Sequence, residues 1–287
     1  MTTIYEKGYG NLSIISVSGD QHLNLEHIGC AFEWRDNKGI LYKADSLGME
    51  EVRFSRQGRV IEAAFEMADT PRFIWKIIDD DHAVRLQAGI ANTTGEYIRI
   101  GTIEPFYMDF SRRSRLKLNG GLLQAQLVSQ RISDAMLTSI HIFEALYQYN
   151  SFYSDNMLSL HDKQGQNGLV LGFTNIKRMF GKILLEFDIN LKFPLSFRAF
   201  SDAEDIPLAP GEKLLSEELW LSIDGLPAQQ MESYAQYTGM KMGARRWFSA
   251  PTGWSTWDYY FGDINEEIIL KNAACLQRDR EDFPLNY

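Results

Sequence analysis

Cysteine is scarce in this sequence, and long apolar runs are absent from it. Only two cysteines occur among 287 residues, Cys30 and Cys275, which excludes a disulfide-rich secreted scaffold. No apolar stretch approaches the roughly 20 residues that cross a bilayer, so we expect no membrane partner. The first residues lack the basic start and apolar core of a secretory signal. We therefore expect a cytoplasmic protein.

Patterns that bind metals, cofactors or nucleic acid are also missing. The five histidines show no metal-ligand spacing, and no Gly-x-Ser-x-Gly elbow occurs. Gly8-Tyr9-Gly10 lacks the third glycine of a dinucleotide-binding loop. The formal net charge of −9 repels nucleic-acid phosphates. We expect no metal, no cofactor and no nucleic-acid partner.

Short stretches in which polar and apolar residues alternate fill most of the chain up to about residue 224. Arg59–Met67, His82–Ala91 and Ile183–Phe193 each place apolar residues at every second position, which is the pattern of a strand with one face in a core. Turn residues separate such stretches, as at 36–39 and 209–211. Many strands, few helices and frequent turns predict a mainly β fold, a large antiparallel β-sandwich.

The pattern changes after residue 225. Pro227–Lys241 has apolar residues at helical spacing, with a proline where a first helical turn tolerates it, and predicts a helix. A stripe from Ile268 to Leu276 predicts a second helix, and Asp263 with Glu266 forms a capping-box pattern before it. Phe283–Tyr287 is typical of the start of another strand.

These patterns divide the chain into three predicted segments. Residues 1–226 are expected to form a β-supersandwich domain, and residues 227–245 a linker helix. Residues 246–287 are expected to form the first βα unit of a (β/α)8 TIM barrel, since a strand, a loop, a helix and a new strand follow one another. A complete barrel needs about 250 residues, so the barrel is predicted to be truncated.

One segment resembles a known enzyme family. Gly253–Phe261 (GWSTWDYYF), followed by Asp263–Glu267 (DINEE), resembles the first barrel strand and helix of glycoside hydrolase family 36, the α-galactosidases and raffinose synthases. The family pattern there is Gly-Trp-x-Ser/Thr-Trp, an aromatic loop and an acidic helix start. Residues 168–173 and 208–213 also look like strand and turn signatures of the family's N-terminal supersandwich. The resemblance implies α-galactoside sugars as partners.

The resemblance also implies three substrate-binding residues. Trp257 occupies the family position that walls the galactose subsite, and an indole face can stack on the apolar C–H face of a pyranose. Trp254 and Asp258 are the other two candidates, because the C-terminal ends of barrel strands build the active site. The alternative for all three is structural: the tryptophans would pack between sandwich and barrel, and Asp258 would end a strand.

No catalytic residue is expected within the chain itself. Retaining glycosidases use two carboxyls about 5–5.5 Å apart, and in this family both lie on later barrel strands. The sequence has no Lys-Trp-Asp nucleophile motif, and the acidic pair that usually closes the second strand is expected beyond Tyr287. The chain alone is therefore predicted to be inactive. Leu41–Phe54 lacks the family motif associated with tetramers, so a homo-oligomer stays open but a shared active site is not expected.

Two other functions remain open at this point. The sandwich could be a non-catalytic carbohydrate-binding or assembly module with Trp34, Trp75 and Trp220 along a groove, although strand tryptophans more often belong to a core. The pair Trp257-Asp258 also resembles galactosyl-transferring raffinose synthases. Acidic runs such as 217–218 are expected on solvated faces, because adjacent strand residues point to opposite sides.

Overall fold

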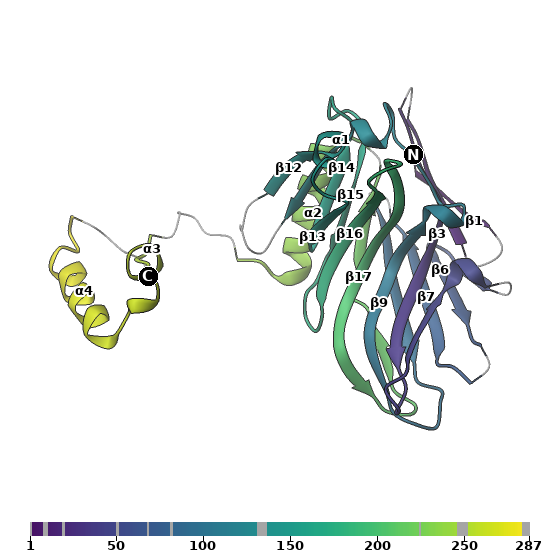
Figure 1. Cartoon of the computed structure of the whole chain (residues 1–287), viewed down its shortest axis with the longest axis horizontal. Helices are drawn as coiled ribbons and strands as arrows, with labels where there is room; N and C mark the ends of the chain where they lie inside the picture. Colours follow the sequence, from purple (N-terminus) through teal and green to yellow (C-terminus); the bar gives the residue numbers. More distant parts are fainter. Residues whose placement is uncertain are drawn as a thin grey trace. The chain divides into compact units, whose positions relative to one another are not determined.

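The structure is a computed structural model that describes residues 2–7, 11–18, 21–49, 52–67, 69–80, 83–130, 137–223, 225–245 and 252–282. The chain divides into two compact units, Met1–Met242 (unit 1) and Gly243–Tyr287 (unit 2). Unit 1 contains two antiparallel sheets (Figure 1). Within the described ranges, no helix is long and apolar enough to cross a membrane.

The first sheet of unit 1 has nine strands in the described residues. They are β1 (Thr2–Lys7), β2 (Asn11–Ser18), β3 (Gln21–Arg35), β4 (Leu41–Asp45), β9 (Ile98–Asp109), β10 (Arg115–Lys117), β13 (Ser151–Asp155), β16 (Phe180–Asp188) and β17 (Phe193–Leu208). Their order is β1-β2-β3-β9-β17-β16-β13, and β4 and β10 also pair with β3.

The second sheet has ten strands in the described residues. They are β5 (Arg53–Gln57), β6 (Val60–Phe65), β7 (Arg72–Asp79), β8 (Val84–Ala91), β11 (Gln126–Gln130), β12 (Leu137–His141), β14 (Met157–His161), β15 (Gly168–Phe173), β18 (Lys213–Leu215) and β19 (Leu219–Ser222). Their order is β12-β11-β14-β15-β19-β8-β7-β6-β5, and β18 pairs with β8.

In the part of the chain that the structure describes, helices are few and mostly short. The α-helices are α1 (Ile142–Ala145), α2 (Pro227–Met242), α3 (Trp257–Tyr260) and α4 (Glu266–Arg278). The 3-10 turns are η1 (Ser46–Gly48), η2 (Phe110–Arg112), η3 (Leu122–Gln124) and η4 (Phe261–Asp263). The predicted helix at Pro227–Lys241 is confirmed by α2.

A large core lies between the two sheets and contains residues of both. Strand β6 illustrates how the sequence builds it: Ile61 and Ala63 are buried, and Glu62 between them is exposed. Trp75 of β7 is fully buried, and its indole N–H donates a hydrogen bond of 3.0 Å to the carbonyl of Pro105. The predicted antiparallel β-sandwich is therefore confirmed.

Helix α2 covers the outer face of the second sheet, opposite the main core. Val170 and Trp220 point away from that core and pack with Tyr234 of the helix in a second apolar cluster. Gly172 permits this approach, because an added Cβ would lie 2.3 Å from the Tyr234 ring. The Tyr234 hydroxyl donates to the carbonyl of Phe173 at 2.7 Å. Strands β15 and β19 are therefore apolar on both faces.

The last turn of α2 is attached to the sheet through a partly buried carboxylate, Glu218. This carboxylate forms ion pairs with Lys241 of the helix and with Arg85 of β8. Burial acts to raise the pKa of Glu218, but the hydrogen bond and charge of Lys241 outweigh it and the pKa lies below its ordinary value. The Arg85 guanidinium also donates to the hydroxyl of Tyr237 at 3.1 Å. Charge and packing together fix α2 to the sandwich.

The neighbouring carboxylate, Glu217, has a different role. It is buried, and one of its oxygens accepts hydrogen bonds of 3.1, 2.8 and 3.3 Å from the backbone N–H groups of Lys177, Arg178 and Met179. It thus organises the loop before β16. The expectation that residues 217–218 form a solvated acidic run is wrong, since both carboxylates have specific partners.

One strand ends earlier than its alternation indicates. The pattern over Ile183–Phe193 predicts a single strand, but β16 ends at Asp188 and β17 begins at Phe193. The carboxylate of Asp188 accepts hydrogen bonds from the backbone N–H groups of Asn190 and Leu191, both at 2.9 Å. This contact stabilises a chain reversal that apolar periodicity does not reveal. The single-strand prediction is therefore wrong in its second half.

Candidate functional site

The three predicted substrate-binding residues all lie in unit 2, at its start. Trp254 belongs to a stretch without regular secondary structure, and Trp257 and Asp258 are the first two residues of α3. The strand expected here is not found in residues 252–282. A parallel strand requires a neighbouring strand for its backbone hydrogen bonds, and residues 252–282 contain no other strand that could supply one. The predicted strand at Phe283–Tyr287 lies outside the described residues.

The indole of Trp257 is open to solvent, with 66% of the residue exposed. It contacts the ring of Phe261 edge-on, with centroids 5.9 Å apart and planes at 74°. The backbone N–H of Trp257 donates to the hydroxyl of Ser255 at 3.3 Å. Trp254 is less exposed, at 37%, and Asp258 is exposed as well. The three residues are neighbours in sequence, and the structure leaves all three exposed to solvent.

The helix that follows agrees with the sequence pattern except at its cap. Helix α4 begins at Glu266, and the side chain of Asn265 accepts a hydrogen bond from the N–H of Ile268 at 2.9 Å. Asn265 is therefore the N-cap, and the predicted cap Asp263 lies in η4. The side-chain amide of Asn272 donates to the hydroxyl of Tyr260 at 3.0 Å, which holds α3 against α4.

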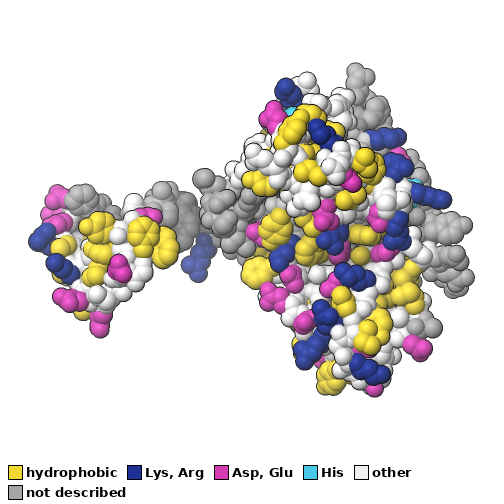
Figure 2. All heavy atoms as spheres, in the orientation of Figure 1, with side chains coloured by type: hydrophobic (Ala, Val, Ile, Leu, Met, Phe, Trp, Pro, Cys, Tyr) yellow, Lys and Arg dark blue, Asp and Glu magenta, His cyan; other side chains and the backbone are white. Residues whose placement is uncertain are grey.

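Unit 2 has no core of its own in its described part. No residue within 252–282 is buried, and large apolar side chains such as Leu270 (62% exposed) and Tyr259 (80% exposed) face solvent. Figure 2 shows several apolar side chains on the surface of this unit. An exposed apolar face of this kind is a surface to which another protein segment can bind.

Hydrogen exchange is expected to separate the two units clearly. The amides of Glu266–Arg278 should exchange at least roughly 100-fold faster than those of Phe180–Asp188, because α4 has no buried contacts to protect it. Exchange measured by mass spectrometry on the intact chain tests this. Equal protection of the two segments would contradict it.

The tryptophans of the sandwich do not form an open sugar-binding groove. Trp75 is fully buried, and Trp34 and Trp220 are each only 3% exposed. Trp34 and Trp75 belong to the core between the sheets, and Trp220 lies under α2. These three indoles pack inside the fold and stabilise it. They therefore do not support a sugar-binding module built on them.

Sequence reasoning gave no indication of a buried acid in β9. Glu104 is 6% exposed, and one of its carboxylate oxygens lies 3.3 Å from the guanidinium of Arg198 on β17. Burial raises the pKa of Glu104 to about 7, even though Arg198 and Lys43 act to lower it. A carboxyl that is half protonated near neutral pH makes the stability of the sandwich depend on pH.

No protein-family model matches the sequence, and a search of curated proteins gives no match. Among solved structures, the chain is similar to a variant of the family 36 α-galactosidase AgaA of Geobacillus stearothermophilus in complex with 1-deoxygalactonojirimycin, with 10% identity and a TM-score of 0.53. That alignment covers 99% of this chain and 49% of that one.

A second structure of AgaA gives 10% identity and a TM-score of 0.52, over 96% of this chain and 48% of that one. A third, a variant in complex with raffinose, gives 11% identity and a TM-score of 0.52 over the same shares. The chain spans about half the length of these structures. At such low identity the likeness establishes the fold alone. The chain has the fold of the N-terminal part of glycoside hydrolase family 36 α-galactosidases.

Proposed function

We propose that this chain is the N-terminal half of a retaining α-galactosidase-like glycoside hydrolase that acts on α-galactosides. The observation that supports this most is the shared fold with AgaA over nearly the whole chain. The GWSTWDYYF segment adds a motif at the position where a barrel would begin. Residues 246–287 would supply the first βα unit of the barrel.

In this proposal the exposed apolar face of unit 2 becomes buried when further barrel strands are present. Residues 252–256 would then pair with a neighbouring strand, and Trp257 would stand at the strand's C-terminal end, where barrel active sites lie. Its solvent-exposed indole would stack on the C–H face of a galactose ring, and Asp258 would accept a hydrogen bond from a sugar hydroxyl. Trp254 would complete the wall.

The nucleophile and the acid/base are proposed to lie beyond Tyr287. The chain alone is therefore expected not to hydrolyse p-nitrophenyl α-galactoside, whereas the protein extended by the following coding sequence is expected to do so. Analysis of the products in the presence of sucrose separates hydrolysis from galactosyl transfer. Hydrolysis by residues 1–287 alone would contradict the proposal.

In the extended protein, Trp257→Ala is expected to lower kcat/KM by about 10- to 100-fold, because an aromatic wall of the sugar site is lost. A matched control is Tyr149→Ala, which removes a ring that is 58% exposed on unit 1. The control is expected to keep full activity. If Trp257→Ala behaves like the control, Trp257 is not a substrate-binding residue.

A further inference from the structure

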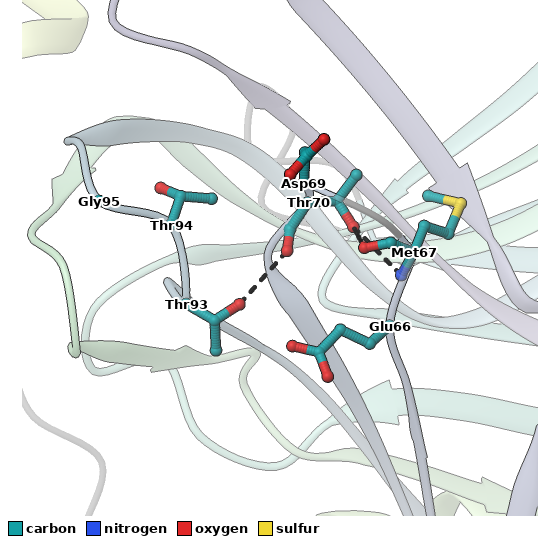
Figure 3. Close-up of a pocket in the computed structure, with 7 residues that line it drawn as sticks. All are labelled: Glu66, Met67, Asp69, Thr70, Thr93, Thr94 and Gly95. Carbon is teal, nitrogen blue, oxygen red and sulfur yellow. Dashed lines mark hydrogen bonds between the residues drawn. The ribbon is translucent and has the colours of Figure 1, made fainter.

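Three turns of unit 1 surround a polar groove that is lined by aromatic rings. They follow β3 (36–40), β6 (66–67 and 69–71) and β8 (92–97). One hollow of about 650 Å³ lies between the second turn, which contributes Glu66, and the third turn, which contributes Thr93 (Figure 3). A second, of about 440 Å³, is bounded by all three turns and shares Asp69, Thr70 and Thr94 with the first. Each volume lies in the range of small-ligand sites, about 300–1,000 Å³.

Hydrogen bonds hold the third turn in place without any ligand. The buried side chain of Asn92 donates to the carbonyls of Glu96 (2.8 Å) and Leu208 (2.9 Å). Its oxygen accepts from the hydroxyl of Thr94 at 2.6 Å. The hydroxyl of Thr93 donates to the carbonyl of Thr70, which links the third turn to the second (Figure 3). The groove is therefore preorganised, which reduces the entropy cost of binding.

Two tyrosines line the groove. Tyr42 lies flat on Trp34, with centroids 5.5 Å apart and planes at 16°, and its hydroxyl donates to the carboxylate of Asp36 at 3.2 Å. The same carboxylate accepts from the backbone N–H of Lys38, so the first turn is fixed as well. Tyr97 is 62% exposed, and nothing in the described part of the chain stacks on its ring. An open aromatic face beside polar groups is a favourable surface for a pyranose ring.

Several charged groups around the second hollow are available for a ligand. The carboxylates of Asp69 and Glu96 have no hydrogen-bond or ion-pair partner among the residues that the structure describes, and the ammonium of Lys38 has no hydrogen-bond partner there but interacts through its charge with Asp36. Asp69 is moreover held at a positive φ of 59°, an uncommon conformation for a residue other than glycine. Such acceptors and donors match the hydroxyl groups of a sugar.

The charge of the groove restricts the class of ligand. Carboxylates outnumber the single lysine around the second hollow, which disfavours phosphates and other anions. No group of three or more His, Cys, Asp or Glu side chains within the described ranges could hold a metal ion, so the acids here are too dispersed for a cation site.

From the open ring, the fixed turns and the free polar groups, we propose that this groove binds a neutral oligosaccharide, with one pyranose stacked on Tyr97. The inference does not depend on the proposed function.

Titration calorimetry of the full chain with raffinose, and separately with maltotriose, tests this site. We expect saturable binding of at least one of them, with a dissociation constant on the order of 1–10 mM. Tyr97→Ala should weaken that binding about tenfold, because it removes the stacking ring. Tyr149→Ala, which removes a ring of similar exposure elsewhere on unit 1, should leave it unchanged within about twofold.

Three results would overturn the inference: no saturable binding of either sugar, equal binding by wild type and Tyr97→Ala, or binding of spermidine in place of sugar.

The variant Trp257→Ala distinguishes this site from the one proposed in unit 2. If raffinose binding is lost in Trp257→Ala but kept in Tyr97→Ala, the groove is not a sugar site and the proposed function stands. The reverse pattern supports the groove and leaves the proposed function to its own activity test.

Discussion

Replacing Trp75 with alanine is expected to lower the free energy of unfolding of the sandwich by about 3–5 kcal/mol, one of the largest effects available to a single substitution. Trp75 is fully buried between the sheets and contacts Phe54, with ring centroids 6.5 Å apart. Its removal leaves a large cavity and also leaves the carbonyl of Pro105 without its donor. The cavity and the unpaired carbonyl both lower the free energy of unfolding.

Urea unfolding followed by far-ultraviolet circular dichroism measures this effect. Trp257→Ala serves as the control, because an exposed tryptophan outside the sandwich should change its stability by less than about 0.5 kcal/mol. If Trp75→Ala does not fold, Trp75→Phe, which keeps most of the volume, should still show a loss of roughly 1–3 kcal/mol. A Trp75→Ala protein as stable as wild type would show that the two sheets do not pack around this residue.

Replacing Glu104 with glutamine is expected to change how stability depends on pH. Because the pKa of Glu104 is raised to about 7 in the folded state from an ordinary value of 4.5, the folded state holds a proton that the unfolded state releases between these two values. The contribution of this group is therefore greatest below pH 4.5 and is lost as the pH rises to about 7. Glutamine cannot ionise and should remove that loss.

At pH 8 we expect Glu104→Gln to be more stable than wild type by roughly 3 kcal/mol, and at pH 4.5 the two proteins should be nearly equal. Chemical unfolding at a series of pH values checks both ends of this range. In the variant the guanidinium of Arg198 still has a carboxylate neighbour, because an oxygen of Glu186 lies 4.0 Å from it. Parallel stability curves for the two proteins would show that Glu104 does not titrate as its burial implies.

Strands whose apolar periodicity coincides with burial were predictable from the sequence. In β8, for example, Val84, Leu86, Ala88 and Ile90 occupy every second position and all four are buried. The α2 helix was equally clear, since its proline and apolar spacing both indicate it. Such features are local, so a window of a few residues contains all of the information.

Features that depend on distant partners were not predictable. The buried carboxylate of Glu217 binds backbone groups about 40 positions away in the chain, and nothing near residue 217 indicates this. The end of β16 depends on a side-chain contact of Asp188 that alternation does not reveal. Burial of Glu104 depends on Arg198, a residue of another strand. In each case a tertiary contact determined the local environment.

Of the two candidate sites, one is visible in a short stretch of sequence and the other depends on contacts between distant residues. The family motif around Trp257 is contiguous, and the sequence was sufficient to suggest it. The groove beside Tyr97 is assembled from three turns that are separated by whole strands, and each turn alone looks like an ordinary polar connection. Only the packing of the two sheets brings Tyr42, Asp69 and Tyr97 to one place.

The coding sequence that follows Tyr287 in the gene tests the central proposal most directly. If this chain is the first half of a family 36-like enzyme, that sequence continues in frame with an acidic pair close to Tyr287 and a Lys-Trp-Asp motif farther on. A stop codon directly after Tyr287, with no barrel strands encoded in any neighbouring frame, would contradict the assignment.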